Sequence, residues 1–221
     1  SSGFSNFRGN YANTLTKGFD FSSRVAILRN ELRWDANFFL SHLNEKVSKY
    51  EGKSLTTNYL QYGDGIGGVF PYEGRPLAGI YSYQWAGLDP VTGAPRGILE
   101  GQPSTDYSAI IGETTPEELV FHGSGRPTWF GALRNDLYYK GFSLSVNISY
   151  RLGYYVKRAS IDYYTLLGGE ISHGDFARRW MSPGDEQVTQ IPSMPEVRDS
   201  QQSSGCRIFA CPTQFRKATA Y

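Results

Sequence analysis

The chain has 221 residues and a formal net charge of +1 at pH 7, from 22 basic and 21 acidic side chains. This balance gives no electrostatic reason to expect nucleic-acid binding, and no stretch is apolar over the ~18 residues that a transmembrane helix requires. Aromatic residues make up 15% of the chain and there are 25 glycines, which favours strands and turns over helices.

Two segments near the N-terminus alternate apolar and polar residues with a period of two, as a strand does when only one face is buried. Strands are expected over residues 17–28 and 32–43, joined by the short link at residues 29–31. The pattern therefore predicts an antiparallel hairpin. The apolar face of the second strand would carry Leu32, Trp34, Ala36, Phe38 and Leu40.

Residues 44–127 form a long stretch rich in Gly, Pro and Tyr. Within it, residues 77–85 alternate well, but they cannot form a single additional crossing of a sheet whose two short turns lie at one end. Residues 54–62 alternate poorly, so we expect both segments to belong to one long loop. Short helices are expected to start at residues 115–118, where a cap residue precedes Pro and two Glu, and within residues 160–167.

A second hairpin is expected from residues 128–139 and 142–153, with Lys140-Gly141 at the turn. The alternation in its second strand is the cleanest in the chain. One face carries Ser, Asn and Arg, whereas the other is almost wholly apolar. The apolar face consists of Phe142, Leu144, Val146, Ile148, Tyr150 and Leu152.

These strands are about twice as long as the ~5–6 residues usual in globular proteins, but they match the ~9–11 residues that a tilted strand needs to cross a bilayer. Short turns alternate with long loops, and aromatic residues lie near the strand ends, as in outer-membrane barrels. The sequence therefore predicts an all-β fold of long antiparallel strands, a fragment of a transmembrane β-barrel. The loops 44–127 and 154–197 would both be extracellular.

No pattern indicates catalysis, a metal site or a cofactor. Residues 63–68 match a glycine-rich dinucleotide motif in letters only, because proline and aromatics follow where a helix should begin. Cys206 and Cys211 have no histidine near them in the sequence, which argues against zinc. We therefore expect no catalytic, metal or cofactor-binding residues.

Several stretches resemble SusC/RagA-type TonB-linked outer-membrane transporters (TonB-dependent receptors) of the Bacteroidetes. Residues 81–95, which read YSYQWAGLDPVTGAP, are similar to the family's Y-x-W-A-G-L-D-P-x-T-G-x-P signature. Residues 123–127 (GSGRP), 139–145 (YKGFSLS) and 179–185 (RWMSPGD) resemble further motifs, and residues 17–20 (KGFD) resemble a strand opening of these barrels. The resemblance covers roughly residues 13–198.

The resemblance implies a late segment of a plugged barrel of about 22 strands, in the cell outer membrane among lipid and lipopolysaccharide. It implies import of an oligosaccharide or peptide, energised by TonB, ExbB and ExbD through an N-terminal region missing here, with a SusD-like surface lipoprotein as partner. Residues 1–198 would be the barrel part. Residues 199–221 depart from the family pattern, and we expect a truncated or frame-shifted reading there.

Within this reading, alternation assigns the roles of individual side chains. Trp34, Phe142 and Ile148 would face lipid. The predicted lumen-lining residues are Arg33, Asp35, Asn37, Arg134, Asp136 and Arg151. The predicted loop residues that contact ligand or partner are Tyr83, Trp85, Leu88, Asp89, Trp129, Tyr154 and Tyr155.

Two other classes remain open at this stage. One is a soluble β-sandwich that binds carbohydrate through exposed aromatic residues, which would have shorter strands and more frequent turns. The other is a β-rich glycosidase, which would need two positioned carboxylates that no sequence feature indicates.

Overall fold

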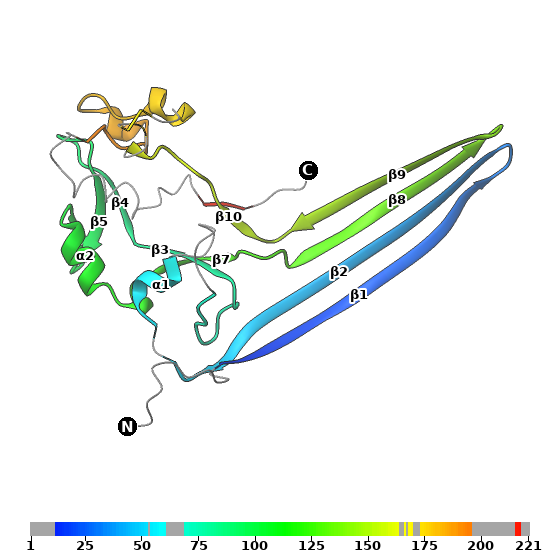
Figure 1. Ribbon diagram of the computed structural model, residues 1–221, viewed down its shortest axis with the longest axis horizontal. Coiled ribbons are helices and arrows are strands. Elements are labelled where there is room, and N and C mark those ends of the chain that lie inside the picture. Colours follow the sequence, from blue (N-terminus) through cyan, green and yellow to red (C-terminus); the bar gives the residue numbers. More distant parts are fainter. Residues whose placement is uncertain are drawn as a thin grey trace.

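The structure is a computed structural model that combines a long arm with a smaller head built from loops (Figure 1). The arm is a single four-stranded antiparallel sheet. The structure describes residues 12–52, 54–60, 69–163, 166, 168–169, 173–195 and 215–217.

The arm consists of β1 (Ala12–Arg29), β2 (Leu32–Tyr50), β8 (Trp129–Tyr139) and β9 (Phe142–Leu152), in the order β1-β2-β8-β9. Both predicted hairpins are therefore confirmed, and so is the all-β antiparallel fold class. The first hairpin is longer than expected, because pairing continues beyond Lys17↔Asn44 to Ala12↔Tyr50. The two hairpins join through β2 and β8, which pair from Leu32↔Tyr139 to His42↔Trp129.

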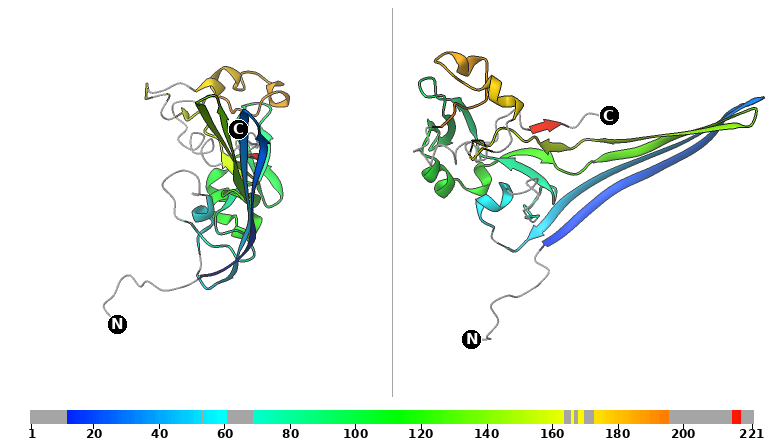
Figure 2. Two further views of the ribbon diagram at one scale, coloured as in Figure 1. Left: turned by 90° about the vertical axis from the view of Figure 1, so that its right-hand side faces the viewer. Right: turned by 45° about the horizontal axis from the view of Figure 1, so that its top comes forward.

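Both short turns lie at the tip of the arm, and the head lies at its other end (Figures 1 and 2). At one turn, Lys140 and Gly141 both have positive φ, 44° and 87°, as a two-residue hairpin turn requires. The described parts of loops 44–127 and 154–197 thus leave the sheet at the same end. Residues 77–86 do not cross as a fifth strand, and neither do the described residues of 54–62.

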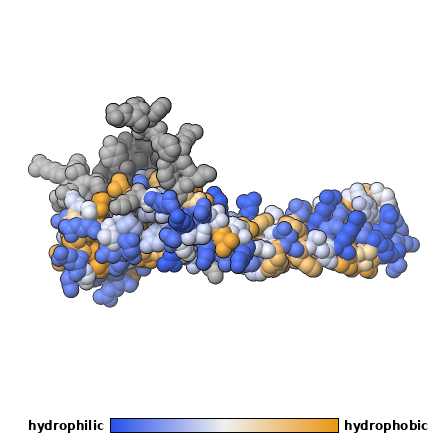
Figure 3. Space-filling model, turned by 90° about the horizontal axis from the view of Figure 1, so that it is seen from below, coloured by the Kyte–Doolittle hydropathy of each residue, from blue (hydrophilic) through white to orange (hydrophobic). Residues whose placement is uncertain are grey.

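The register aligns the alternation across all four strands, so the sheet has one apolar and one polar face. Leu40, Gly131 and Tyr150 lie side by side on the apolar face, as do Trp34 and Leu137. No second layer of described residues covers this face, and Phe142 is 80% exposed and Leu144 58%. Apolar residues gather along the arm beside hydrophilic ones (Figure 3). A sandwich would have a second sheet here, so the sandwich reading is not favoured.

The head is built from short elements in three small sheets, β3-β7, β4-β5-β6 and β10-β11. Residues 115–118, expected to start a helix, form only a single 3₁₀ turn capped by Thr115 and Glu118. Of the expected helix within residues 160–167, part lies outside the described residues. The elements are α1 (Thr56–Leu60), β3 (Gly79–Ser82), β4 (Trp85–Leu88), β5 (Pro95–Leu99), β6 (Gln102–Ser104), α2 (Tyr107–Glu113), η1 (Pro116–Glu118), β7 (Val120–Ser124), β10 (Tyr155–Lys157), η2 (Gly174–Arg178), η3 (Asp185–Gln187) and β11 (Phe215–Lys217).

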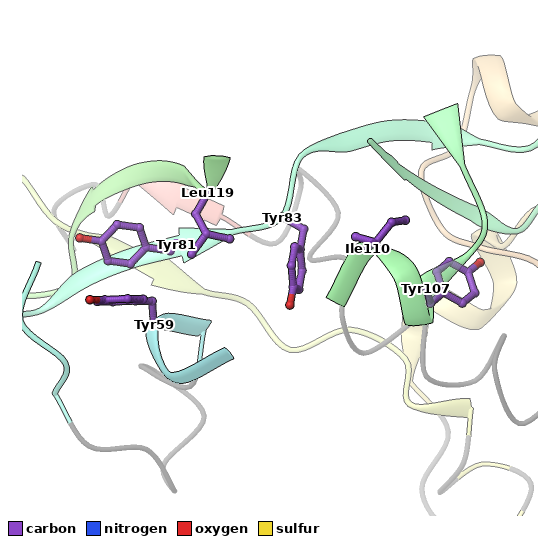
Figure 4. Close-up of a cluster of buried hydrophobic side chains, with 6 residues drawn as sticks. All are labelled: Tyr59, Tyr81, Tyr83, Tyr107, Ile110 and Leu119. Carbon is purple, nitrogen blue, oxygen red and sulfur yellow. The ribbon is translucent and has the colours of Figure 1, made fainter. Parts of the chain in front are cut away.

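Tyrosines dominate the core of the head (Figure 4). Two smaller aliphatic side chains from α2 and the segment before β7 complete the cluster. The cluster consists of Tyr59, Tyr81, Tyr83, Tyr107, Ile110 and Leu119.

None of the described helices is long and apolar enough to span a membrane.

Three sequence expectations fall outside the described residues. They are the glycine-rich motif at residues 63–68, the cysteines Cys206 and Cys211, and most of the tail 199–221. Of the tail, only the backbone of β11 is described, paired with β10.

Candidate functional site

The predicted lumen-lining residues lie together on the polar face of the arm. Asp35 pairs with Asp136 and Asn37 with Arg134 across β2 and β8. Arg33 lies next to Tyr138, with its guanidinium carbon 5.2 Å from the ring centroid. Arg151 shares this face at the head end of β9, opposite Phe130.

Arginines neutralise the two aspartates that face each other on this surface. Like charges directly opposite on adjacent strands repel each other. Arg29 donates two hydrogen bonds to Asp35, at 2.6 and 2.9 Å. Arg134 donates to Asp136 at 3.0 Å, and Ser145 donates to the same carboxylate at 2.6 Å. The pair is therefore held by local partners, with the Asp35 and Asp136 side chains only 16% and 14% exposed.

The apolar face carries aromatic side chains near both ends. At the head end, His42 stacks on Trp129 with ring centroids 4.1 Å apart, and Phe19 contacts both rings. At the tip, Lys140 lies over the ring of Tyr139. Trp129, predicted in a loop, is the first residue of β8 and faces the apolar side. This arrangement is typical of the aromatic girdles of membrane barrels.

In the head, the signature stretch at residues 81–95 builds a tight turn. The Asp89 carboxylate accepts hydrogen bonds from the backbone N–H of Val91 and Thr92, at 3.0 and 2.8 Å, and from the Thr92 hydroxyl at 2.9 Å. Burial raises the pKa of Asp89, but these hydrogen bonds outweigh it and keep the pKa below its usual value. The Asp89 carboxylate therefore stabilises its own turn, and its hydrogen bonds are made within this turn rather than to a ligand.

The same turn connects the two long loops. Gly93 has φ +70°, and its Cα packs so closely on the Trp180 indole that a Cβ would overlap the ring. Ser193 donates its backbone N–H to the Gly93 carbonyl at 3.0 Å. Trp180 is only 8% exposed and donates its indole N–H to Glu186 at 3.3 Å. We call the contact between Gly93 and Trp180, with the Ser193 hydrogen bond, the loop clasp.

Some predicted loop residues are not on the surface. Tyr83 is 3% exposed and Leu88 is 2% exposed, so the expectation that they face a ligand or partner is wrong for both. Tyr83 belongs to the tyrosine core, and Trp85 packs against that core. Tyr154 is half-buried, and the ring of Tyr155 lies against Gly123. Aromatic residues in this chain therefore serve the head's interior as well as its surface.

Sequence reasoning missed a buried ion cluster in the second loop. The Asp175 carboxylate, fully buried, accepts hydrogen bonds from Arg158 at 2.6 Å, from Ser160 at 2.8 Å and from Arg178. Burial raises the pKa of Asp175, but the bonds from Ser160 and Arg158 outweigh it and hold the pKa below its usual value. Arg178 lies in the same 3₁₀ helix as Asp175, but Arg158 and Ser160 precede Asp175 by 17 and 15 residues, and no local sequence signal links them to it.

Arg24 alternates with apolar residues on the polar side of the first predicted strand, but it was not among the predicted lumen-lining residues. Its backbone partner is Asn37, so it lies in the row that contains Arg134 and Asn147. No group of three or more His, Cys, Asp or Glu within the described part of the chain could hold a metal ion.

No protein-family model matches this sequence, and no curated protein matches it. Solved structures do resemble the chain. They are a RagAB peptide transporter (TM-score 0.59, 15% identity), the RagAB peptide importer in its closed-closed state (0.62, 17%) and the same importer in its open-open state (0.58, 16%). The matches cover 93–94% of this chain but only 21–22% of those chains. At such identities the likeness shows the fold, and the chain spans about a fifth of these neighbours' length.

Proposed function

We propose that this chain is part of a TonB-dependent nutrient importer of the SusC/RagA type in the cell outer membrane. The four long strands would be a segment of the barrel wall. The apolar face would contact lipid and the polar face would line the lumen. The head, which includes residues 51–127 and 154–197, would lie outside the cell, while residues 44–50 of the predicted loop belong to β2.

One observation carries this proposal, namely an uncovered four-stranded sheet with one apolar face. In a water-soluble protein, a face with Phe142 at 80% and Ile148 at 53% exposure would need a second layer. A bilayer supplies that layer. Both outer strands, β1 and β9, also have an edge with no partner among the described residues, as expected for a piece of a longer closed sheet.

The transported substrate would be an oligosaccharide or a peptide. The importer's partners would be a SusD-like surface lipoprotein and, through a region N-terminal to this segment, TonB with ExbB and ExbD. The structural likeness to a peptide importer supports transport, and it gives no support to an enzymatic role. Nucleic acid is not an expected partner, since the charge is balanced.

The test uses the protein expressed from its own gene, with Cys206 and Cys211 replaced by serine. Single cysteines are placed at Asn147 and Ile148, neighbours on opposite faces of β9. With a water-soluble maleimide on isolated membranes, Asn147→Cys should react and Ile148→Cys should not, because lipid covers only the second. Equal labelling, or recovery of the protein without detergent, would favour the sandwich.

A second pair of cysteines tests the orientation. Val91 is 75% exposed in the head, and Glu31 lies at a tip turn with a 79% exposed side chain. In intact cells, Val91→Cys should react with a membrane-impermeant maleimide, whereas Glu31→Cys should react only after the cells are opened. The reverse result would contradict the proposed topology.

A further inference from the structure

The polar face carries more positive than negative charge from the tip of the arm to the row of Ser41. This part holds five arginines but only three aspartates, and Glu45, opposite Thr16, lies beyond it on the same face. Two of the arginines form ion pairs, Arg29 with Asp35 and Arg134 with Asp136. The third aspartate, Asp20, accepts a hydrogen bond from Ser41. The arginines are Arg24, Arg29, Arg33, Arg134 and Arg151.

The other three arginines of this face form no ion pair with a carboxylate of the described residues. Within the described residues, no carboxylate lies within salt-bridge distance of Arg24, Arg33 or Arg151. All three side chains are exposed. Arg33 lies over the Tyr138 ring, which holds the guanidinium in place without neutralising it. Arg24 and Arg33 also attract the Asp35 carboxylate electrostatically, but only Arg29 is hydrogen-bonded to it, so all three guanidinium groups can still bind an anion.

The register spaces these arginines evenly. Arg151 is in the row of Ser41 and Phe130, Arg24 is in the row of Asn37 and Arg134, and Arg33 is in the row of Tyr138. Successive rows on one face are ~6.8 Å apart, because each advances two residues at ~3.4 Å. An arginine without a carboxylate thus recurs every second row, about every 14 Å along the strands.

We propose that these three arginines form a track on the lumen face that binds acidic peptides. This inference rests on the proposed function, and it narrows the substrate class. Guanidinium groups bind carboxylates through paired N–H donors. Arg24 and Arg33, on adjacent strands, are about 14 Å apart, which matches roughly four residues of extended peptide, whereas Arg151 on β9 is about 20 Å from Arg24 on β1. Between the arginines, the face offers Asn37, Asn147 and Ser149, whose amides and hydroxyl can hydrogen-bond a peptide backbone.

The test measures binding to the full protein, purified in detergent. The probe is a fluorescent tetraglutamate peptide, compared with tetralysine, tetraserine and tetragalacturonate. The track variant is Arg24→Gln/Arg33→Gln/Arg151→Gln. The matched control, Lys17→Gln/Arg126→Gln/Lys140→Gln, removes the same charge from exposed positions that do not lie on the track.

The unmodified protein and the control should prefer tetraglutamate to the other probes. The track variant should bind it about tenfold more weakly, since the two exposed ion pairs that a four-residue peptide can span are lost together. The difference should shrink as salt rises. Equal binding by the track variant and the control, or a preference for tetralysine, would overturn the proposal. A preference for tetragalacturonate would overturn the assignment to peptides.

Failure of this proposal can be told apart from failure of the proposed function. Membrane fractionation and cysteine labelling report the location of the sheet, whereas the binding comparison is made on purified protein. A protein that fractionates with the outer membrane but shows no dependence on the track arginines would refute the track alone.

Discussion

Gly93 and Trp180 are far apart in the sequence, yet the indole of Trp180 occupies the space that a side chain at position 93 would fill. The contact joins a turn of the first long loop to the second loop. Its geometry needs glycine twice over, since φ is +70° and the ring leaves no room for a Cβ. The two loops are therefore fastened into one head.

We predict that Gly93→Ala loosens the loop clasp. The substitution combines an unfavourable φ with overlap against the indole. Gly101 has a similar φ of +79° but nothing within 4 Å of its would-be Cβ, so Gly101→Ala serves as a control for the backbone strain alone. Gly93→Ala should cost about 2 kcal/mol more than the control, from overpacking. Hydrogen exchange of residues 89–95 and 180–193 would measure it, and equal protection in both variants would show that the clasp does not matter.

Trp34 and Asn135 form a hydrogen-bonded pair on the apolar face, and the effects of their substitutions on stability should be coupled. Trp34 donates its indole N–H to the Asn135 side-chain oxygen at 3.1 Å, so an amide that would face lipid has a partner. Trp34→Phe should destabilise the sheet by about 1–3 kcal/mol, because that oxygen is left without a donor. Adding Asn135→Leu should restore much of the loss. Thermal unfolding in detergent measures this, and purely additive effects would contradict the coupling.

Gly131 allows one tyrosine to reach across a neighbouring strand. The Tyr150 hydroxyl passes over Gly131 and donates to the Phe39 carbonyl at 2.9 Å. A Cβ at position 131 would overlap both groups. Gly131→Ala should therefore lower the stability of the sheet by about 2 kcal/mol. Gly174→Ala, a site with open space, is the control and should have little effect.

The buried ion cluster predicts a pH dependence for the second loop. The pKa of Asp175 lies below its unfolded value of about 3.9, so the stability it contributes is present above pH ~4 and is lost as the pH falls through the folded pKa. Asp175→Asn should therefore weaken the second loop at pH 7. The gap between variant and unmodified protein should narrow below pH ~4. Proteolysis of this loop across pH measures it, and a constant gap would argue against the linkage.

The arm could be derived from the sequence because alternation is a local signal that repeats over many residues. The polar and apolar sets of β8 and β9 follow from period-two patterning, and the turn at Lys140-Gly141 follows from the need for positive φ. Because both short turns were expected at one end of the sheet, both long loops were expected at the other end, and the structure shows this arrangement. The ends of β1 and β2 were missed, since residues 44–50 do not alternate cleanly.

The head could not be derived in this way. Residues such as Leu88 and Tyr83 look like exposed loop residues in the sequence, but both are buried. Tyr83 lies in a cluster with Tyr59, which precedes it, and Tyr107, which follows it in the chain. The role of Asp89 could not be derived either. Its neighbours predict a turn, yet only the packing of Trp180 on Gly93 reveals that this turn fastens one loop to another.

The sequence by itself determined the long strands, their two faces and their short turns, because these depend on residues two apart and on backbone preferences. Only the tertiary structure decided that β2 pairs with β8, which brings Asp35 opposite Asp136 and spaces Arg24, Arg33 and Arg151 along one face. Register between distant strands is set by packing and hydrogen bonding over the whole sheet. No local pattern in a single strand contains that information.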